Sequence, residues 1–552
     1  MFVRSLTNKA GKVYTYVLHS VYDKTKKRSV HKRLANLTGL PQAAIDAVKA
    51  VLEGRPPIFD LEPAAISIAK SRLLGPLWIA LIFWLRLRLD KAAFLTRSEF
   101  RSLTAMVVGR VVNPVACRSE RRTAEWLCRT AAGLLIAGNA ERSWNRNAFY
   151  PVLTKLSENW DKVERTLWEN RSARPNLYLY DITSTYFEGR GGSMGKFGYS
   201  RDERKGNPQV VVALVADENG VPVALRILPG NTRDSSTVVD MAKELRETFG
   251  VDRAVVIMDR GMRAEANIDY LLDHGVGYIM ALKHKEAREF LARNNDLLEW
   301  ELFDERNLAE WTENGKRYVI CKNPGAAVRD RHTRERIMQK AEIRLEGLVT
   351  MAEKGRVKDR GKIIARAAKI LTQTNTEKYF DYEAETGSFK YWRKKERLAM
   401  EEDYEGCYVI ETTLEENEAD KTEVDASYRN QREIEEVFKS CKDELHLRPN
   451  FHVKDENILG HIRLTFLAHL VKKHLELVLR SNGRFEKGST FLMGFDNVMI
   501  NDVAVKGESL SVISELDEKQ RAALEDANLK MPTGQMKSSL DKHLPKSLQG
   551  II

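Results

Sequence analysis

The spacing of hydrophobic and polar residues changes several times along the chain, and each change predicts a different structural unit. Residues 1–40 alternate between apolar and polar side chains, as in VYTYVLHSVYD, which predicts a small β region. Residues 41–170 follow a helical period, with Arg side chains spread along the expected helices. An Arg-rich helical region fits DNA binding, but arginines are also ordinary on helix surfaces, and the sequence leaves both interpretations open.

From Asn176 the pattern is that of alternating strands and helices. The segment NLYLYDITSTYF predicts a strand, and QVVVALVADENGVPVALRILPGN predicts two strands joined by a tight turn at Asn219–Gly220. A helix, a strand that runs into Asp259, a second helix and a short strand follow. We therefore predict an α/β fold over residues 171–295 with the element order β-β-β-α-β-α-β, which is the order of the ribonuclease H-like fold.

The segment Tyr428–Lys442 predicts a helix with a buried face. One apolar stripe at helical spacing contains Ile434, Val437, Phe438, Cys441 and Leu445. A second stripe, at the edge of the buried face, contains Tyr428, Gln431, Glu435, Lys439 and Lys442. A carboxylate at that edge can be anchored and still reach a cleft, so Glu435 is a candidate for chemistry. Taken alone, the segment fits an amphipathic surface helix equally well.

Other parts of the chain are less specific. Residues 296–404 mix strand-like segments such as KRYVICKN with strongly basic helix-like ones, and such a basic run is usually a solvated face. Residues 405–475 add a strand, YEGCYVIETT, before the Glu435 helix and a long amphipathic helix after it. Residues 476–552 are polar and contain no recognisable motif.

Composition narrows the class of partner. The 552 residues are too many for a single core, and 89 Lys and Arg against 78 Asp and Glu give a net charge of +11. This balance favours an anionic partner, with nucleic acid first. The five cysteines are scattered, without a CxxC pair or a companion His at zinc-ligand spacing, which indicates a reducing cytosol and argues against structural zinc. The apolar run Leu73–Leu85 is too short to span a bilayer, so we expect no membrane segment.

Three carboxylates offer a common chemistry. Asp181 and Asp259 each follow a predicted strand, and if the two strands are neighbours, both carboxylates lie at the same end of the sheet. With Glu435 they form a set of hard oxygen ligands that suits Mg²⁺ or Mn²⁺ better than zinc. Two such ions about 4 Å apart can activate a nucleophile and stabilise a leaving 3′ oxygen at phosphorus. Either Asp alone is common at the end of a strand.

Together these segments resemble the DDE transposases of bacterial insertion sequences that have a Tyr-x2-Arg-x3-Glu-x6-Lys signature around the catalytic Glu. Tyr428, Glu435 and Lys442 match the signature. The Arg position is Gln431, and the flanking Arg429 and Arg432 are candidates for its phosphate contact. The segments DITSTYF, GNTRD, DRGM and IEEVFK also resemble the corresponding parts of the family.

The resemblance implies a ribonuclease H-like core in two parts, 171–295 and 405–475, interrupted by a mostly β insertion domain at 296–404. It also implies N-terminal DNA binding through a small β region and a helical region. Dimerisation is implied as well, with residues 476–552 as a candidate region for it. The expected partners are double-stranded DNA, as element ends and as target, and a second copy of the chain in a synaptic complex. The expected location is the bacterial cytoplasm, on the nucleoid.

The resemblance also implies the roles of the acidic residues. Asp181, Asp259 and Glu435 would bind two Mg²⁺ ions, for which Mn²⁺ substitutes, and Glu435 would be a metal ligand rather than a general base. The expected activity is metal-dependent cleavage of the element ends and strand transfer to target DNA, which is cut-and-paste transposition.

Further residues are candidates for DNA contact. Lys439 and Lys442 by charge and Tyr428 by hydrogen bonding are suited to hold the backbone near the scissile phosphate, although Tyr428 also fits packing at a helix end. Trp392 lies beside a basic RKK run and could stack on an extruded base or belong to a core. Arg201 and Arg204 lie in a basic, Gly-rich loop that could approach DNA or be a surface hairpin.

Two alternatives stay open. A stand-alone nuclease of the ribonuclease H-like class would need neither a region that reads DNA ends nor a basic insertion. An inactive descendant that binds or regulates DNA would keep the scaffold and would be marked by the loss of one carboxylate, whereas this sequence has all three.

Overall fold

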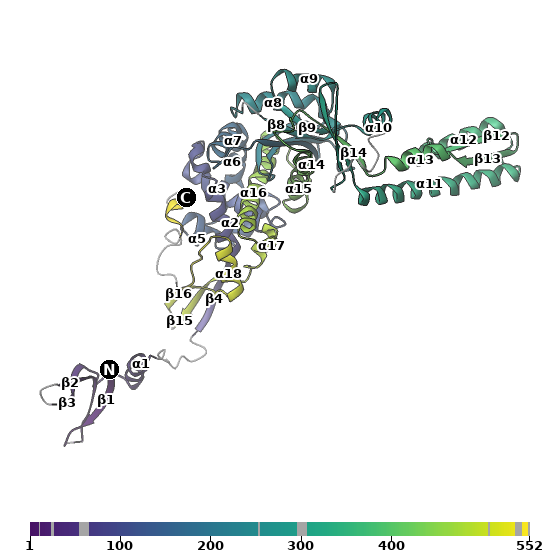
Figure 1. Cartoon of the computed structure of the whole chain (residues 1–552). Coiled ribbons are helices and arrows are strands. Elements are labelled where there is room, and N and C mark those ends of the chain that lie inside the picture. Colours follow the sequence, from purple (N-terminus) through teal and green to yellow (C-terminus); the bar gives the residue numbers. More distant parts are fainter. Residues whose placement is uncertain are drawn as a thin grey trace. The chain divides into compact units, whose positions relative to one another are not determined.

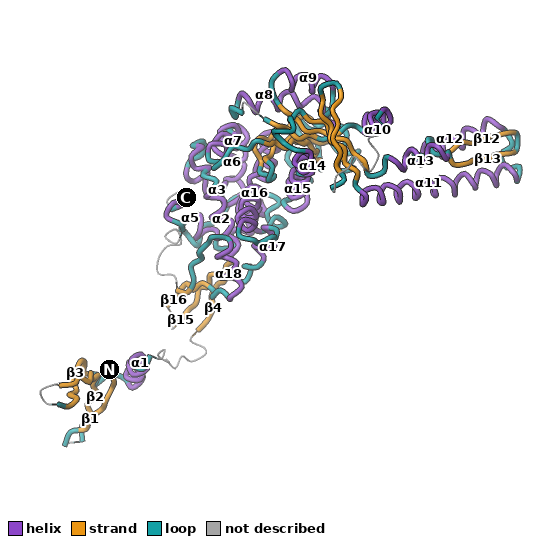
Figure 2. Tube along the Cα trace, viewed as in Figure 1, coloured by secondary structure: helices purple, strands orange, loops and turns teal. Residues whose placement is uncertain are grey.

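The computed structural model shows two compact units (Figures 1 and 2). The first unit contains residues 1–72, 499–514 and 533–537, and the second contains the rest of the chain. Among the described residues, no helix is both long and apolar enough to cross a membrane. The structure describes residues 1–9, 11–23, 27–54, 66–251, 254–294, 306–505, 508–535 and 544–549.

The first unit contains a three-stranded antiparallel sheet in the order β1-β2-β3, which confirms the small β region predicted for residues 1–40. The short helix α1 (Gln42–Leu52) contacts β1. The alternating pattern of these strands is local, so it is legible in the sequence. The strands are β1 (Phe2–Thr7), β2 (Val13–Asp23) and β3 (Arg28–Asn36).

A second sheet in this unit joins segments from opposite ends of the sequence, in the order β17-β16-β15-β4. The hydroxyl of Ser71 donates a hydrogen bond to Asn501 Oδ1 across it at 2.7 Å. The prediction of helices throughout residues 41–170 is therefore wrong at β4, whose strand partners lie more than four hundred residues away in sequence. The strands are β4 (Ile66–Leu73), β15 (Met499–Val505), β16 (Glu508–Ile513) and β17 (Gly534–Gln535).

The second unit contains a helical part built around α16 (Asp455–Ser481), which packs against α2, α3 and α6. Every residue of α2 except Arg86 is buried, so most of the apolar run Leu73–Leu85 lies in a buried helix. The helices pack closely at Gly460, where an added Cβ would lie 2.6 Å from the carbonyl oxygen of Leu153. The other helices here are α2 (Gly75–Arg86), η2 (Leu89–Ala92), α3 (Arg97–Val112), α4 (Glu120–Leu127), α5 (Ala132–Ala137), α6 (Arg146–Glu158), α7 (Trp160–Glu169), α17 (Gly488–Met493), α18 (Glu518–Asp526) and η9 (Lys546–Leu548).

The centre of the second unit is an eight-stranded mixed sheet in the order β10-β11-β14-β9-β8-β5-β6-β7. Strands β5, β8 and β9 pair in parallel, and the other neighbours are antiparallel. The predicted strands and helices from β5 to β9 are all present in the predicted chain order. The strands are β5 (Leu177–Tyr186), β6 (Gln209–Asp217), β7 (Pro222–Pro229), β8 (Val255–Met258), β9 (Gly277–Ala281), β10 (Leu308–Glu313), β11 (Lys316–Lys322) and β14 (Cys407–Thr412).

Helices α8 and α9 cover one face of this sheet (Figure 1). Apolar side chains of the helices and of alternate strand positions, including Tyr178, Tyr180 and Met258, form a continuous core there. Because successive strand residues point to opposite faces, the residues between them point to the other face. The helical elements on this side are η3 (Asp234–Thr237), α8 (Val238–Glu247), η4 (Arg260–Met262) and α9 (Glu265–Asp273).

The stretch predicted as a mostly β insertion is instead mostly helical within its described residues, and its strands β10 and β11 extend the main sheet. The helices α11 and α12 pack together and against the β12–β13 hairpin around a small core of their own. Apolar residues of α11 recur at helical spacing between basic and acidic ones, a pattern that basic composition obscured. The elements are α10 (His284–Arg293), α11 (Pro324–Glu353), α12 (Arg360–Thr374), β12 (Phe380–Glu385), β13 (Ser388–Arg393) and α13 (Lys395–Asp403).

The helix predicted over Tyr428–Lys442 is broken into three pieces. These are α14 (Lys421–Arg429), α15 (Gln431–Lys439) and a π-helical turn, η7 (Ser440–Glu444). All five residues of the predicted apolar stripe are buried. Tyr428 therefore belongs to α14 and Glu435 to α15, so the two lie on separate helices rather than on one continuous stripe.

Candidate active site

Strand pairing places Asp181 and Asp259 side by side. The parallel ladder between β5 and β8 ends with the pair Tyr180 and Met258, and the two aspartates are the next residue on each strand. Asp181 lies inside β5 rather than at its end, since β5 continues along β6 as far as Tyr186. Asp259 directly follows β8 and caps η4, where its Oδ2 accepts a hydrogen bond from the Gly261 N–H at 3.4 Å.

Both aspartates point away from α8 and α9. Tyr180 and Met258, the residues before them, belong to the core under those helices, so alternation turns the carboxylates to the opposite face. Helix α15 packs against β5, and its Ile434, Val437 and Phe438 are buried. Glu435 is exposed beside this buried stripe.

The negative charges of Asp259 and Glu435 act on the carboxyl group of Asp181. Burial, together with these two charges, raises the pKa of Asp181 to about 7, against the hydrogen bond from the Ile182 N–H and the charge of Arg201. That hydrogen bond to Asp181 Oδ1 is 2.7 Å long. Strands β5 and β8 and helix α15 thus bring together the three acidic residues that the sequence singles out.

Tyr428 borders the same group. Burial and the charges of Asp259 and Glu435 raise the pKa of Tyr428 to about 12, so its hydroxyl is protonated at neutral pH and can donate a hydrogen bond. Its ring also packs on Tyr408 of β14, with ring centroids 5.9 Å apart. The packing and the site-facing interpretations of Tyr428 are therefore both consistent with its position.

Basic residues around the site are held by internal ion pairs. Arg201 bonds both carboxylate oxygens of Asp234 at 2.6 Å, and its backbone N–H donates to Ser184 Oγ of β5 at 3.1 Å. Lys442 Nζ lies 2.9 Å from Asp202 Oδ1, an oxygen to which Arg448 also donates. Burial lowers the pKa of Lys442 and Asp202 opposes that shift.

The sequence analysis did not predict the acidic partners of these basic residues. Asp202 is almost completely buried, yet nothing in its local sequence indicates that Lys442 and Arg448, more than two hundred residues away, pair with it. Asp234 had a signal, because it is the last residue of the GNTRD segment. The two acids fix the loop that carries Arg201 and Arg204 against β5 and η7.

The other residues predicted to contact DNA differ in their exposure and in their partners within the chain. Arg429 forms an ion pair with Asp425 at 2.8 Å, and Lys439 lies 3.5 Å from Glu436. Gln431 is the first residue of α15 and is half-buried, and Arg432 beside it is exposed. Arg204 lies over the ring of Tyr186, 5.6 Å from its centroid.

Trp392 is not a core residue. It lies on β13, opposite Asp381 of β12, and 45% of the residue is exposed. This exposure does not fit the core interpretation, and stacking on an external partner stays a prediction. Its strand is not among the elements that carry the three carboxylates.

The family follows from residues 173–471, which match the family model of the transposase DDE domain. The chain belongs to this family. The match covers more than half of the chain and includes all three carboxylates together with the strands and helix that position them.

Other comparisons add little to the family assignment of this DDE transposase. No curated protein matches the chain. Among solved structures, the chain is similar to a piggyBac transposase synaptic complex with hairpin DNA, with 9% identity over 87% of this chain and 91% of that chain. The TM-score is 0.38, too low for structural inference.

The donor set of the site fits divalent cations. All three acidic residues offer oxygen atoms, which Mg²⁺ and Mn²⁺ prefer. A bound cation would neutralise their negative charges, which add to the effect of burial on the pKa of Asp181. Within the described residues the site thus combines anionic oxygens with a neutral phenol and fixed arginine nearby.

Proposed function

We propose that this DDE transposase cleaves the ends of a bacterial insertion sequence and joins them to target DNA, with Asp181, Asp259 and Glu435 as ligands of two Mg²⁺ or Mn²⁺ ions. The observation that carries the proposal is the convergence of these carboxylates from β5, β8 and α15 on one face of the sheet. The strand order β7-β6-β5-β8-β9, with β5, β8 and β9 parallel, supports the ribonuclease H-like prediction.

Each residue of the site has a defined task in this mechanism. When bound, divalent cations supply the polarisation of a water or 3′-hydroxyl nucleophile and the stabilisation of the leaving oxygen. Asp181 and Asp259 hold their oxygens at fixed positions because both lie at the end of the same parallel ladder. Glu435 supplies the third ligand, and the protonated hydroxyl of Tyr428 donates a hydrogen bond to a phosphate oxygen.

The remaining contacts are assigned to the DNA backbone. Arg201 and Arg204 approach it from the loop fixed by Asp202 and Asp234, and Lys442 is available where a phosphate displaces Asp202. Four more of the proposed contacts lie on α14 and α15, namely Arg429, Gln431, Arg432 and Lys439. The exposed Trp392 stacks on an extruded base.

The proposal also includes the assembly. Two element ends must be paired before joining, so we infer a homodimeric synaptic complex, in which residues 476–552 are candidates for the interface. The reaction takes place on chromosomal DNA in the bacterial cytoplasm.

The experiment that tests this function uses DNA that carries the gene's own flanking ends. Purified protein with Mg²⁺ is expected to produce 3′-hydroxyl nicks at the ends and, with a target plasmid, joined products. Hydrolysis of the ends without joining would favour a stand-alone nuclease. Specific binding without any nick would favour an inactive, DNA-binding descendant.

The Mg²⁺ requirement is expected to depend on pH because Asp181 has a raised pKa. Below its pKa of about 7 the proton on Asp181 competes with the cation. The Mg²⁺ concentration for half-maximal nicking should therefore rise by about tenfold per pH unit on the acid side of that value, since one proton is displaced per binding event. Nicking rates are measured against Mg²⁺ concentration at several pH values, and a Mg²⁺ requirement that does not change with pH would contradict the shift.

The N-terminal sheet is proposed to read the element ends. Residues 1–40 contain nine Lys or Arg and one acidic residue. On one face of the sheet Arg4 pairs in register with Tyr16, whose ring stacks with that of Tyr14. Arg33 lies 4.5 Å from the ring centroid of Tyr16, and Lys12 lies 5.7 Å from that of Tyr14. This face combines cations with aromatic rings in the way that DNA-binding surfaces do.

Replacing Arg4, Lys12 and Arg33 together by Gln is expected to weaken binding to end DNA and to flatten its salt dependence. Each lost phosphate contact removes roughly 0.9 from the slope of log affinity against log salt, so the slope should fall by about 2 to 3. Fluorescence anisotropy over a salt series measures it. A matched triple variant replaces three exposed basic residues on and near α18 and is expected to keep the wild-type slope. These residues are Lys519, Arg521 and Lys530. Equal slopes for the two triple variants would show that the N-terminal sheet does not contact the DNA.

A further inference from the structure

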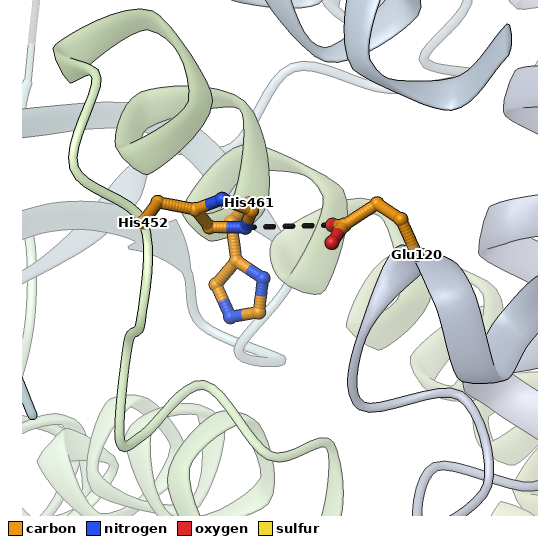
Figure 3. Close-up of side chains that lie close together, drawn as sticks. All are labelled: Glu120, His452 and His461. Atoms are coloured by element: carbon orange, nitrogen blue, oxygen red, sulfur yellow. Dashed lines mark ion pairs between the residues drawn. The ribbon is translucent and has the colours of Figure 1, made fainter. Parts of the chain in front are cut away.

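Three side chains outside the carboxylate site converge in the helical part of the second unit (Figure 3). Glu120 begins α4, His452 lies in the loop before α16, and His461 lies on α16. One ligand atom from each lies within 4.8 Å of the others. Glu120 is 4% exposed and His461 is 3% exposed, and the side chain of His452 is 14% exposed. None of them belongs to β5, β8 or α15.

By hydrogen-bond geometry, neither Nδ1 nor Nε2 of the buried His461 ring is bonded within the described part of the chain, although the Leu447 backbone lies close enough to act on the ring. A neutral imidazole has one N–H donor and one acceptor, and leaving such groups unpaired in the interior costs free energy. Figure 3 shows this ring beside that of His452, and the ring centroids are 5.4 Å apart. The cluster therefore contains an unused nitrogen ligand next to a second imidazole and a carboxylate.

The spacing also suits a small cation. His452 Nε2 lies 3.4 Å from Glu120 Oε1. Two ligands on a tetrahedral Zn²⁺ ion, each about 2.0–2.1 Å from the metal, are about 3.4 Å apart. The Glu120–His452 pair thus already has the separation of two zinc ligands. A ring nitrogen of His461 lies within 4.8 Å of the ligand atoms of both, so a small movement of this side chain completes the set.

Arg110 is a buried positive charge near the cluster, and it opposes a cation. Its guanidinium donates to the carbonyl oxygens of Cys117 at 2.9 Å and Leu445 at 3.1 Å, and to Thr465 Oγ1 at 3.3 Å. In the described residues none of its hydrogen bonds goes to Glu120. The carboxylate oxygens therefore stay available, and the negative charge of Glu120 offsets that of Arg110.

We propose that Glu120, His452 and His461 bind one Zn²⁺ ion at a site separate from the catalytic carboxylates. Two imidazoles and one carboxylate are a zinc-type donor set, whereas Mg²⁺ prefers oxygen ligands alone. The ion links α4 to α16 and to the loop that follows the Glu435 helix. Asn450, two residues before His452, bonds the backbone of Tyr186 and Glu188 at the end of β5, so the link reaches the strand that carries Asp181.

The sequence argument against structural zinc does not cover this site. That argument rests on the absence of CxxC pairs and of His at short spacing from Cys. Here two ligands lie nine residues apart and the third lies on a helix more than three hundred residues earlier, so only the fold brings them together.

The test measures bound metal in the full-length chain, without reference to DNA cleavage. The parent is the Asp181→Asn, Glu435→Gln double variant, which lacks two of the proposed Mg²⁺ ligands. It is stripped with a chelator, reloaded with Zn²⁺, separated from free metal and analysed by mass spectrometry for zinc. We expect about one zinc per chain, the stoichiometry of a single three-ligand site. Reloading with Co²⁺ should give the intense visible absorption of a four-coordinate ion.

Glu120→Gln, His452→Asn and His461→Asn are expected to lose the bound zinc. Each removes a direct ligand, so the affinity should fall by more than the roughly 10–100-fold that the loss of an outer-shell partner costs. His446→Asn is the matched control, because His446 lies in the same segment at a positive φ of 52° that Asn tolerates, and it is outside the cluster. This control should keep the zinc.

Thermal unfolding separates metal binding from a purely structural role. Zn²⁺ should raise the midpoint of the parent and of His446→Asn, and should leave that of His461→Asn unchanged. If the ligand variants do not fold, the Co²⁺ spectrum and zinc content of the parent decide the matter. A parent without zinc after reloading, a weak six-coordinate Co²⁺ spectrum, or equal zinc in folded ligand variants would overturn the proposal. Because the parent lacks catalytic ligands, none of these outcomes bears on the transposase function.

Discussion

Asp181→Asn, Asp259→Asn and Glu435→Gln are each expected to abolish strand cleavage while binding to end DNA stays close to wild type. Each change keeps the size of the side chain and removes one anionic oxygen ligand. Metal ions contribute several kcal/mol to transition-state stabilisation, so the loss should reach roughly a thousandfold or more in rate. Nicking of end DNA in Mg²⁺ measures cleavage, and a gel-shift titration measures binding.

The matched control for Glu435 is its neighbour Glu436. Glu436→Gln changes an exposed carboxylate on the same helix, which pairs only loosely with Lys439 at 3.5 Å. We expect this variant to nick at the wild-type rate. An Asp181, Asp259 or Glu435 variant that also nicked at the wild-type rate would exclude that residue from the catalytic site.

The strands around Asp181 could be predicted because the sequence patterns that define them are local. Alternation over NLYLYDITSTYF and the Asn219–Gly220 turn define β5, β6 and β7 without any knowledge of distant partners. The apolar stripe beside Glu435 was equally legible, since its period lies within three helical turns. The sequence therefore placed the two strands and the helix that hold the carboxylates.

Features that depend on distant partners were not predictable. Strand β4 pairs with β15 from the other end of the chain, and its short alternating segment gave no hint of that partner. Lys442 looked like a free phosphate ligand, but Asp202 neutralises it in the folded chain. The zinc cluster proposed above combines α4 with α16, so no spacing rule could find it. In each case the information lies in the packing of elements rather than within one element.

The prediction of a mostly β insertion was wrong for a different reason. Its charged residues dominate the composition, and short strand-like segments such as KRYVICKN drew attention to β structure. That segment is β11 of the main sheet. Buried positions of α11, such as Met338, Ala341 and Leu345, recur at spacings of three and four, which is the helical signal that the composition masked.

Glu411→Ala is expected to lower both the stability of the chain and its cleavage activity. Glu411 of β14 is completely buried, 2.7 Å from Arg263 and 2.6 Å from the hydroxyl of Tyr278. Despite its burial, these two hydrogen bonds hold the pKa of Glu411 below its ordinary value. Removing one partner of a buried ion pair typically costs about 3–5 kcal/mol, and the loss here should be smaller because Arg263 keeps Glu286 as a partner, 2.8 Å away. The midpoint of thermal unfolding should fall accordingly.

The loss of activity follows from the position of Arg263, which ends the η4 turn that begins at Asp259. Without Glu411 this turn loses the anchor that ties it to β14, so Asp259 is held less firmly beside Asp181. Glu289→Ala is the control, because its pair with Lys285 on α10 is exposed on both sides and is worth about 1 kcal/mol or less. An unfolding midpoint for Glu411→Ala equal to that of the control would show that the buried pair does not anchor the turn. A lower midpoint with unchanged nicking at a temperature where the variant is folded would separate stability from the positioning of Asp259.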